Sequence, residues 1–140
     1  MKTLLQTFLL TISFIVFNLE AESKPNIIIF LVDDLGWADI SLRGAPFDTP
    51  NIDSLFQEGM SLDRFYATPI CSPTRAALMT GRDPMRLGVA YGVIMPWMNN
   101  GIHPDEHFMP QSFQADGYQT AIVGKWHLGH SQAVFHPNYR

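Results

Sequence analysis

The chain has 140 residues, of which 46% are hydrophobic and 16% are charged. This composition excludes a disordered or fibrous protein, and the length is that of one domain. The formal net charge is −4 and no basic run is present, so we predict no nucleic-acid partner. The single cysteine, Cys71, excludes an internal disulfide framework and any multi-cysteine metal site.

Residues 1–21 have the pattern of a secretory signal peptide. Lys2 gives a positive start, and the apolar stretch from Leu4 to Phe17 is shorter than the roughly 20 helical residues that span a bilayer. We predict cleavage after Ala21, with a membrane anchor or a buried helix as the alternatives. The mature chain, residues 22–140, would then have no transmembrane segment. It would be secreted or periplasmic, or lysosomal or extracellular in a eukaryote.

The elements that follow alternate between strand and helix. Residues 26–32 form an unbroken apolar run, which predicts a strand buried on both faces of a parallel sheet. Thr49 as N-cap and Pro50 at the first position begin a helix that ends at Gly59. Residues 60–66 are predicted to be a second strand.

Ser72 as N-cap and Pro73 begin a second predicted helix, which ends at Gly81. A long loop over 83–108, a short helix over 111–115 and a third strand over 118–124 follow. The alternation predicts an α/β fold with a mainly parallel central sheet. Three strands make a thin sheet, so we expect the chain to be part of a longer protein.

Three groups of residues are candidates for metal binding, anion binding or catalysis. Asp33 and Asp34 follow the first predicted strand, at the sheet edge where ligands bind in open α/β folds. Two adjacent carboxylates repel each other unless a cation lies between them, and oxygen ligands favour Ca²⁺ or Mg²⁺. The alternative is an ordinary polar turn with Asp34 exposed.

Cys71 is predicted to lie just before a helix N-terminus, where free backbone N–H groups favour an anion. Arg75 follows one turn later, and its guanidinium suits a tetrahedral oxyanion. Lys125 and His127 follow the third predicted strand, at the same sheet edge as Asp33 and Asp34 if the strands are parallel. Both could reach one pocket there, the lysine as a positive charge and the histidine as a hydrogen-bonding or proton-transfer group. The alternatives are a buried cysteine, a solvated arginine, a surface lysine and a packed histidine.

Four short segments of the sequence resemble motifs of a known family. Residues 71–82, CSPTRAALMTGR, match the sulfatase signature, whose core is Cys-x-Pro-Ser/Thr-Arg. Residues 124–129, GKWHLG, resemble the second sulfatase signature, and residues 32–37 and 49–53 resemble two further sulfatase motifs. The resemblance covers residues 24–140, and residues 33–86 look most like arylsulfatases of the N-acetylgalactosamine-4-sulfatase kind.

The resemblance implies an alkaline-phosphatase-like α/β sandwich, incomplete in this chain, and the hydrolysis of aryl or sugar sulfate esters. It implies that a formylglycine-generating enzyme acts on residues 71–75 and converts Cys71 to Cα-formylglycine, whose hydrate attacks sulfur. Arg75 would hold the hydrate, Lys125 would bind the sulfate, and His127 would hydrogen-bond a hydrate hydroxyl. Asp33, Asp34 and position 71 would be ligands of Ca²⁺, with Mg²⁺ possible.

The resemblance leaves parts of the site unassigned. Calcium takes about 6–8 oxygen ligands, more than these residues supply. The family's remaining metal ligands, the acid for the leaving group and a second sulfate-binding lysine cannot be assigned here, so we expect the chain to be inactive alone. The alternatives are a phosphonate or phosphodiester hydrolase of the same superfamily, a non-catalytic relative that binds sulfated glycans, and a thiol enzyme that uses Cys71 directly.

Overall fold

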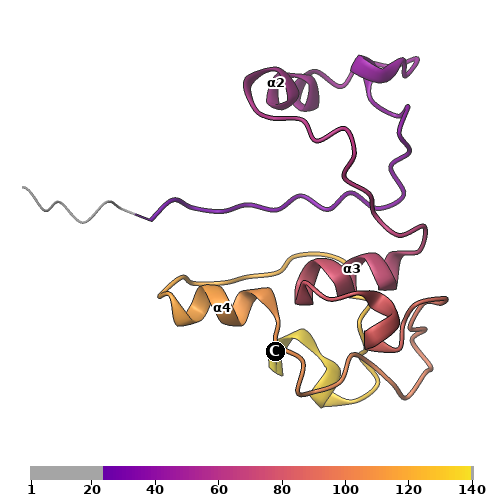
Figure 1. The fold of residues 1–140 in the computed structure, drawn as a ribbon, viewed down its shortest axis with the longest axis vertical. Coiled ribbons are helices and arrows are strands. Elements are labelled where there is room, and N and C mark those ends of the chain that lie inside the picture. The colour runs from indigo at the N-terminus through magenta and orange to yellow at the C-terminus, as the bar shows by residue number, and fades with distance from the viewer. Residues whose placement is uncertain (1–23, 140) are drawn as a thin grey trace, which may run out of the picture. The chain divides into compact units, whose positions relative to one another are not determined.

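The computed structural model describes residues 24–139, and the predicted signal peptide lies outside these residues (Figure 1). The chain divides into two units, with the boundary between Val32 and Asp33. No helix within residues 24–139 is both long enough and apolar enough to cross a membrane.

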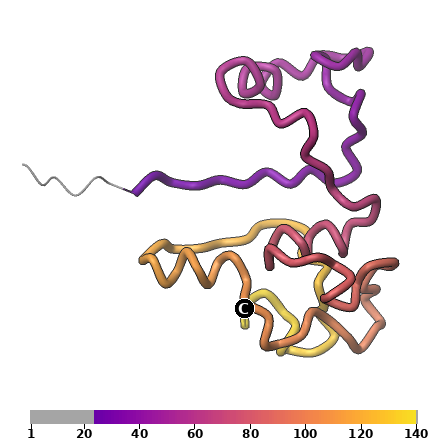
Figure 2. The backbone as a smooth tube through the Cα atoms, viewed as in Figure 1, coloured from indigo at the N-terminus to yellow at the C-terminus, as the bar shows by residue number. Residues whose placement is uncertain are grey.

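The described part of the first unit, residues 24–32, is an extended segment without helix or strand (Figure 2). Its apolar side chains are exposed; Ile28 and Phe30, for example, are 75% and 80% accessible. The prediction of a strand buried on both faces is therefore wrong for this chain. A buried parallel strand needs a hydrogen-bonded neighbouring strand, and residues 24–139 contain no β-strand.

The second and third predicted strands also lack ladder partners. Residues 60–66 and 118–124 contain no β-strand, and neither does any other segment of the described chain. Large apolar side chains in these two segments, such as Phe65 and Val123, are exposed. The central sheet of the predicted α/β fold therefore stays a prediction.

Helix α2 spans Pro50–Glu58 and confirms the predicted helix, with Thr49 as N-cap and Gly59 as C-cap. The 3₁₀ helix η1, Ser41–Arg43, packs against it. The Thr49 hydroxyl accepts a hydrogen bond from the Ser41 backbone N–H at 3.0 Å and donates to Asp53 Oδ1 at 3.0 Å. These bonds tie the start of α2 to η1.

Helix α3, Cys71–Thr80, is the centre of the remaining structure. Gly81 ends it with a φ of 66°, a left-handed conformation that glycine adopts without steric cost. The 3₁₀ helix η2 (Pro84–Leu87) and helix α4 (Met109–Ala115) pack against α3. Helix α4 begins two residues before the predicted 111–115 helix. The short 3₁₀ helices η3 (Ala133–Phe135) and η4 (Pro137–Tyr139) follow.

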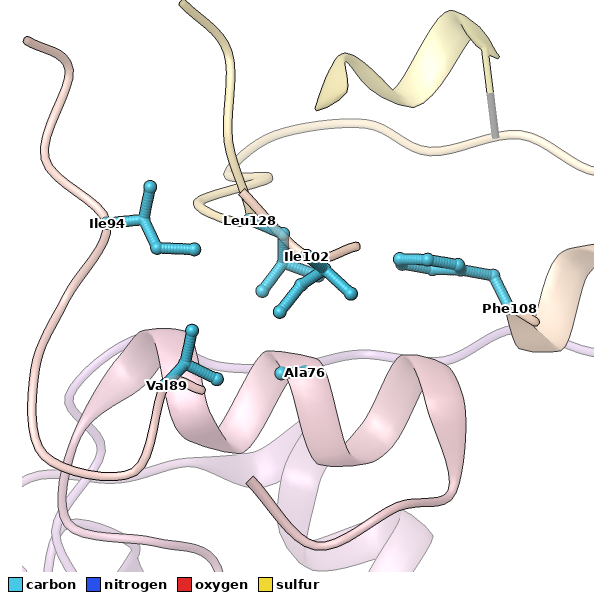
Figure 3. Close-up of a cluster of buried hydrophobic side chains, with 6 residues drawn as sticks. All are labelled: Ala76, Val89, Ile94, Ile102, Phe108 and Leu128. Carbon is cyan, nitrogen blue, oxygen red and sulfur yellow. The ribbon is translucent and has the colours of Figure 1, made fainter. Parts of the chain in front are cut away.

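The hydrophobic core of the second unit lies on one side of α3 (Figure 3). Side chains from the helix, from the loop after it and from the later segments meet there: Ala76, Val89, Ile94, Ile102, Phe108 and Leu128. The Phe108 ring is fully buried and lies 5.7 Å from the Trp126 ring, centroid to centroid. The core therefore joins α3 to the segment that contains Lys125 and His127.

Replacement of Phe108 by alanine tests this core. Phe108→Ala should lower the free energy of unfolding by about 3 kcal/mol or more, because it removes a buried ring and leaves a cavity. Phe65→Ala is the matched control; its side chain is 77% exposed, and the change should stay within about 0.5 kcal/mol. Urea denaturation followed by tryptophan fluorescence measures both. Equal losses in the two variants would contradict the assigned core.

Candidate active site

The first turn of α3 presents Cys71. The helix begins at Cys71 itself, and Ile70, in extended conformation, is the N-cap. The Ile70 carbonyl accepts hydrogen bonds from the Thr74 backbone N–H at 3.1 Å and from the Thr74 hydroxyl at 2.9 Å. The Thr74 hydroxyl also lies 2.6 Å from that of Thr68. These bonds fix the direction in which the chain enters the helix, and so the position of Cys71.

The prediction that Ser72 is the N-cap is wrong. The N-cap is Ile70, two residues earlier, and the Ser72 hydroxyl makes hydrogen bonds outside the helix. It donates to the backbone carbonyl of His127 at 2.8 Å and accepts from the backbone N–H of Ile94 at 3.1 Å. Ser72 is completely buried.

Residues 125–128 alternate between the core and the first turn of α3. Leu128 is buried in the core, and Trp126 packs against it and donates a hydrogen bond to the Phe135 carbonyl at 2.9 Å. The His127 ring instead contacts Cys71, and the Lys125 backbone carbonyl accepts a hydrogen bond from Arg75; both partners belong to α3. The structure thus places His127 beside Cys71 and the Lys125 backbone beside Arg75, and the predicted roles of the two residues stay a prediction. The segment is not a continuous extended strand, however, because His127 has a φ of 62°.

Cys71 and His127 are in direct contact. The Cys71 Sγ lies 3.3 Å from His127 Nδ1, and both residues are partly buried. Burial lowers the pKa of His127, and the positive charges of Lys125 and Arg75 lower it further. The imidazole is therefore neutral near neutral pH, which is the form that can accept a proton from a group at position 71.

Arg75 and Lys125 bring positive charge to the same place. The Arg75 guanidinium donates to the Lys125 backbone carbonyl at 2.5 Å, and its side chain is only 11% exposed. Lys125 Nζ donates to both carboxylate oxygens of Asp33, at 3.0 and 2.9 Å. Arg75 also lies 3.8 Å from Asp33. Asp33 therefore lies next to both Lys125 and Arg75 in the structure.

The Asp33–Lys125 pair shifts both titrations. The hydrogen bond from Lys125 lowers the pKa of Asp33, and the same bond raises the pKa of Lys125. Both side chains are substantially exposed, so the pair is screened by water and fixes geometry more than it stabilises the fold. Its consequence is that the Lys125 ammonium is held beside Arg75.

The predicted metal ligands are only partly assembled. Asp34, next to Asp33, is exposed and has a φ of 56°, a conformation that aspartate tolerates better than most residues. No three His, Cys, Asp or Glu side chains within residues 24–139 are grouped so that they could hold one ion. Both oxygens of Asp33 face an ammonium group. The described residues therefore fit a share of a Ca²⁺ or Mg²⁺ site and do not complete one.

Comparison with known proteins shows the family of the chain. The family model described as Sulfatase matches residues 25–137. N-acetylgalactosamine-6-sulfatase of Mus musculus is 45% identical over 126 residues, which cover 84% of this chain and 24% of that protein. Arylsulfatase A of Bos taurus is 44% identical over 114 residues, which cover 80% of this chain and 22% of that protein.

Among solved structures, the crystal structure of Ps i-CgsB in complex with k-i-k-neocarrahexaose aligns with a TM-score of 0.78 and 40% identity. The match covers 84% of this chain and 26% of that chain. The chain belongs to the sulfatase family. It spans about a quarter of the length of the curated relatives it matches. The finer resemblance to N-acetylgalactosamine-4-sulfatases stays a prediction.

The ion pair yields a prediction about pH. In the metal-free chain, carboxyl NMR should place the titration midpoint of Asp33 below the usual range of aspartate, and Lys125→Met should move it upward. Because the pKa is lowered in the folded state, the pair stabilises the fold above the pKa of the unfolded chain. That stabilisation is lost as the pH falls through the folded pKa.

Arg64→Met removes an exposed positive charge and is the control. It should leave the midpoint of Asp33 unchanged. If Lys125→Met also left the midpoint unchanged, the assigned hydrogen bond would be absent in solution.

Proposed function

We propose that this protein hydrolyses sulfate esters at the site formed by Cys71, Arg75, Lys125 and His127. The observation that carries the proposal is the contact of Cys71 with His127, next to the Arg75 and Lys125 cations, in a chain of the sulfatase family. Residues 22–140 would supply the part of the catalytic domain that holds the nucleophile. A substrate sulfate would need positive charge beside the nucleophile, and Arg75 and Lys125 provide it.

The nucleophile is proposed to be Cα-formylglycine, made from Cys71 by a formylglycine-generating enzyme that recognises residues 71–75. When formed, this group supplies an aldehyde hydrate with one hydroxyl to attack sulfur and a second that later allows sulfate to leave. The neutral His127 imidazole can hydrogen-bond a hydroxyl at position 71 and accept its proton, because its Nδ1 already faces that side chain.

Arg75 and Lys125 would stabilise the negative charge that develops in the transition state. As the S–O bond to the alcohol breaks, its electron pair passes to the leaving oxygen, so negative charge develops there as well as on the sulfuryl oxygens. The Arg75 guanidinium can hold two of these oxygens at once. Lys125 contributes a single ammonium, oriented by Asp33. Each group therefore stabilises the transition state more than the bound ester.

The proposal includes a divalent cation, Ca²⁺ or Mg²⁺, with Asp33 and Asp34 as part of its ligand set. Oxygen ligands of this kind suit either ion. The cation would supply further charge stabilisation, and ligands beyond residues 24–139 would be needed to complete its site. Asp33 would then have to share its carboxylate between the cation and Lys125.

The substrate is proposed to be an aryl or sugar sulfate. Two of the similar proteins carry names or ligands of this kind, N-acetylgalactosamine-6-sulfatase and the Ps i-CgsB complex with k-i-k-neocarrahexaose. The name of the first and the ligand of the second each contain a sugar, which favours a sulfated glycan. The predicted signal peptide, residues 1–21, supports a secreted or periplasmic location, where such glycans occur.

Activity of the intact protein from its native host tests the proposal. Release of 4-nitrophenol from 4-nitrophenyl sulfate should exceed release from an aryl phosphonate. Arg75→Ala and Lys125→Ala should each lower kcat/KM by roughly 10²–10³-fold, the loss typical when a group that stabilises transition-state charge is removed. Cys71→Ala should abolish turnover.

Arg64→Ala, at an exposed position, is the matched control and should retain activity. Faster turnover of the phosphonate would favour the phosphonate hydrolase alternative. Binding of sulfated glycans without cleavage would favour the non-catalytic alternative. Inactivation by iodoacetamide would indicate a thiol enzyme.

A further inference from the structure

We propose that Ser72 is a positioning residue, which holds the backbone of His127 so that its imidazole faces position 71. The inference rests on the proposed function, because it assigns Ser72 a role at that site. Ser72 makes no direct contact with the reacting group in this proposal. It acts through His127.

The Ser72 hydroxyl joins three segments that are distant in the sequence. It belongs to the first turn of α3, accepts from the Ile94 N–H at 3.1 Å and donates to the His127 carbonyl at 2.8 Å. A hydroxyl has one donor hydrogen, and here it is directed to His127. Ser72 is completely buried, so water cannot replace either bond if the hydroxyl is removed.

The conformation of His127 needs such a bond. Its φ of 62° lies in the left-handed region, which a residue with a side chain adopts only at a cost and keeps only when its surroundings fix it. Two successive carbonyls are held at this point, that of His127 by Ser72 and that of Leu128 by the Ile102 N–H at 3.1 Å. Without the first bond, the peptide after His127 is free to turn toward the extended conformation.

The imidazole would move with that peptide. Cys71 Sγ and His127 Nδ1 are 3.3 Å apart. Ser72 follows Cys71 on the same helical turn and bonds to the His127 carbonyl, so this hydrogen bond helps to set that distance. A displacement of about 1 Å between reacting groups can cost about 10²-fold in rate. Ser72 therefore couples the position of the base to the position of the nucleophile.

The test compares Ser72→Ala and Ser72→Thr in the intact protein. Ser72→Ala should lower kcat by roughly 10–100-fold with KM nearly unchanged, because substrate binding by Arg75 and Lys125 is left intact. Ser72→Thr keeps the hydroxyl and should recover most of the rate. Peptide mass spectrometry verifies that position 71 is converted equally in each variant.

Thr80→Ala is the matched control. Thr80 is a partly buried hydroxyl residue of the same helix, and its Oγ1 donates to the Ala76 carbonyl at 2.7 Å, away from the site. Its kcat should stay within about twofold of the wild-type value, which corresponds to less than about 0.5 kcal/mol. Should Ser72→Ala fail to fold, Ser72→Cys keeps the side-chain volume with a weak donor and should show an intermediate kcat.

A second readout does not depend on activity. Hydrogen exchange of the Ile94 amide should be faster in Ser72→Ala than in Ser72→Thr or Thr80→Ala, and the three-bond amide–Hα coupling of His127 should change only in Ser72→Ala. If the wild-type protein cleaves no sulfate ester, the proposed function fails and these two measurements decide the role of Ser72. Wild-type kcat, or an unchanged His127 coupling, in Ser72→Ala would overturn the assignment.

Discussion

The packing of residues 125–129 onto the first turn of α3 is the constraint on which the site depends. Leu128 and Trp126 pack this segment against the hydrophobic core beside α3. The backbones of Gly129 and Gly101 also lie close together, because a Cβ atom on Gly129 would be 2.7 Å from the Cα of Gly101. The His127 side chain instead contacts Cys71 in the first turn of α3, and the Lys125 side chain contacts Asp33. One hydrophobic contact therefore brings together groups more than fifty positions apart in the sequence.

Charge at the site runs against the charge of the chain. The chain carries a formal net charge of −4, whereas two cations, Arg75 and Lys125, and one carboxylate, Asp33, meet beside Cys71. The positive charge is therefore local, as recognition of an anionic group requires. Asp33 bonds to Lys125 and also pairs with the largely buried Arg75 at 3.8 Å, so one carboxylate offsets part of the charge of two cations. In the proposed site, Arg75 and Lys125 would bind the anionic group, and the neutral imidazole of His127 would transfer the proton.

Local structure could be predicted from the sequence more readily than contacts between distant segments. Thr49, Pro50 and Gly59 act through local backbone chemistry, so the helix at 50–58 could be predicted from neighbouring residues. The residues of the site could be predicted because they lie within short sulfatase-like motifs. Burial of residues 26–32 depends on distant partners, which local pattern cannot supply. Ser72 was missed because a capping serine and a serine that bonds to distant segments look the same in sequence; its burial distinguishes them.

The most direct measurement of the central claim is peptide mass spectrometry of the tryptic segment Phe65–Arg75, from protein made in its native host. The account predicts an aldehyde or its hydrate at position 71, because residues 71–75 carry the Cys-x-Pro-x-Arg pattern and the folded site places Arg75, Lys125 and His127 around that position. An unmodified thiol in all of the protein, from a host shown to modify other sulfatases, would contradict it.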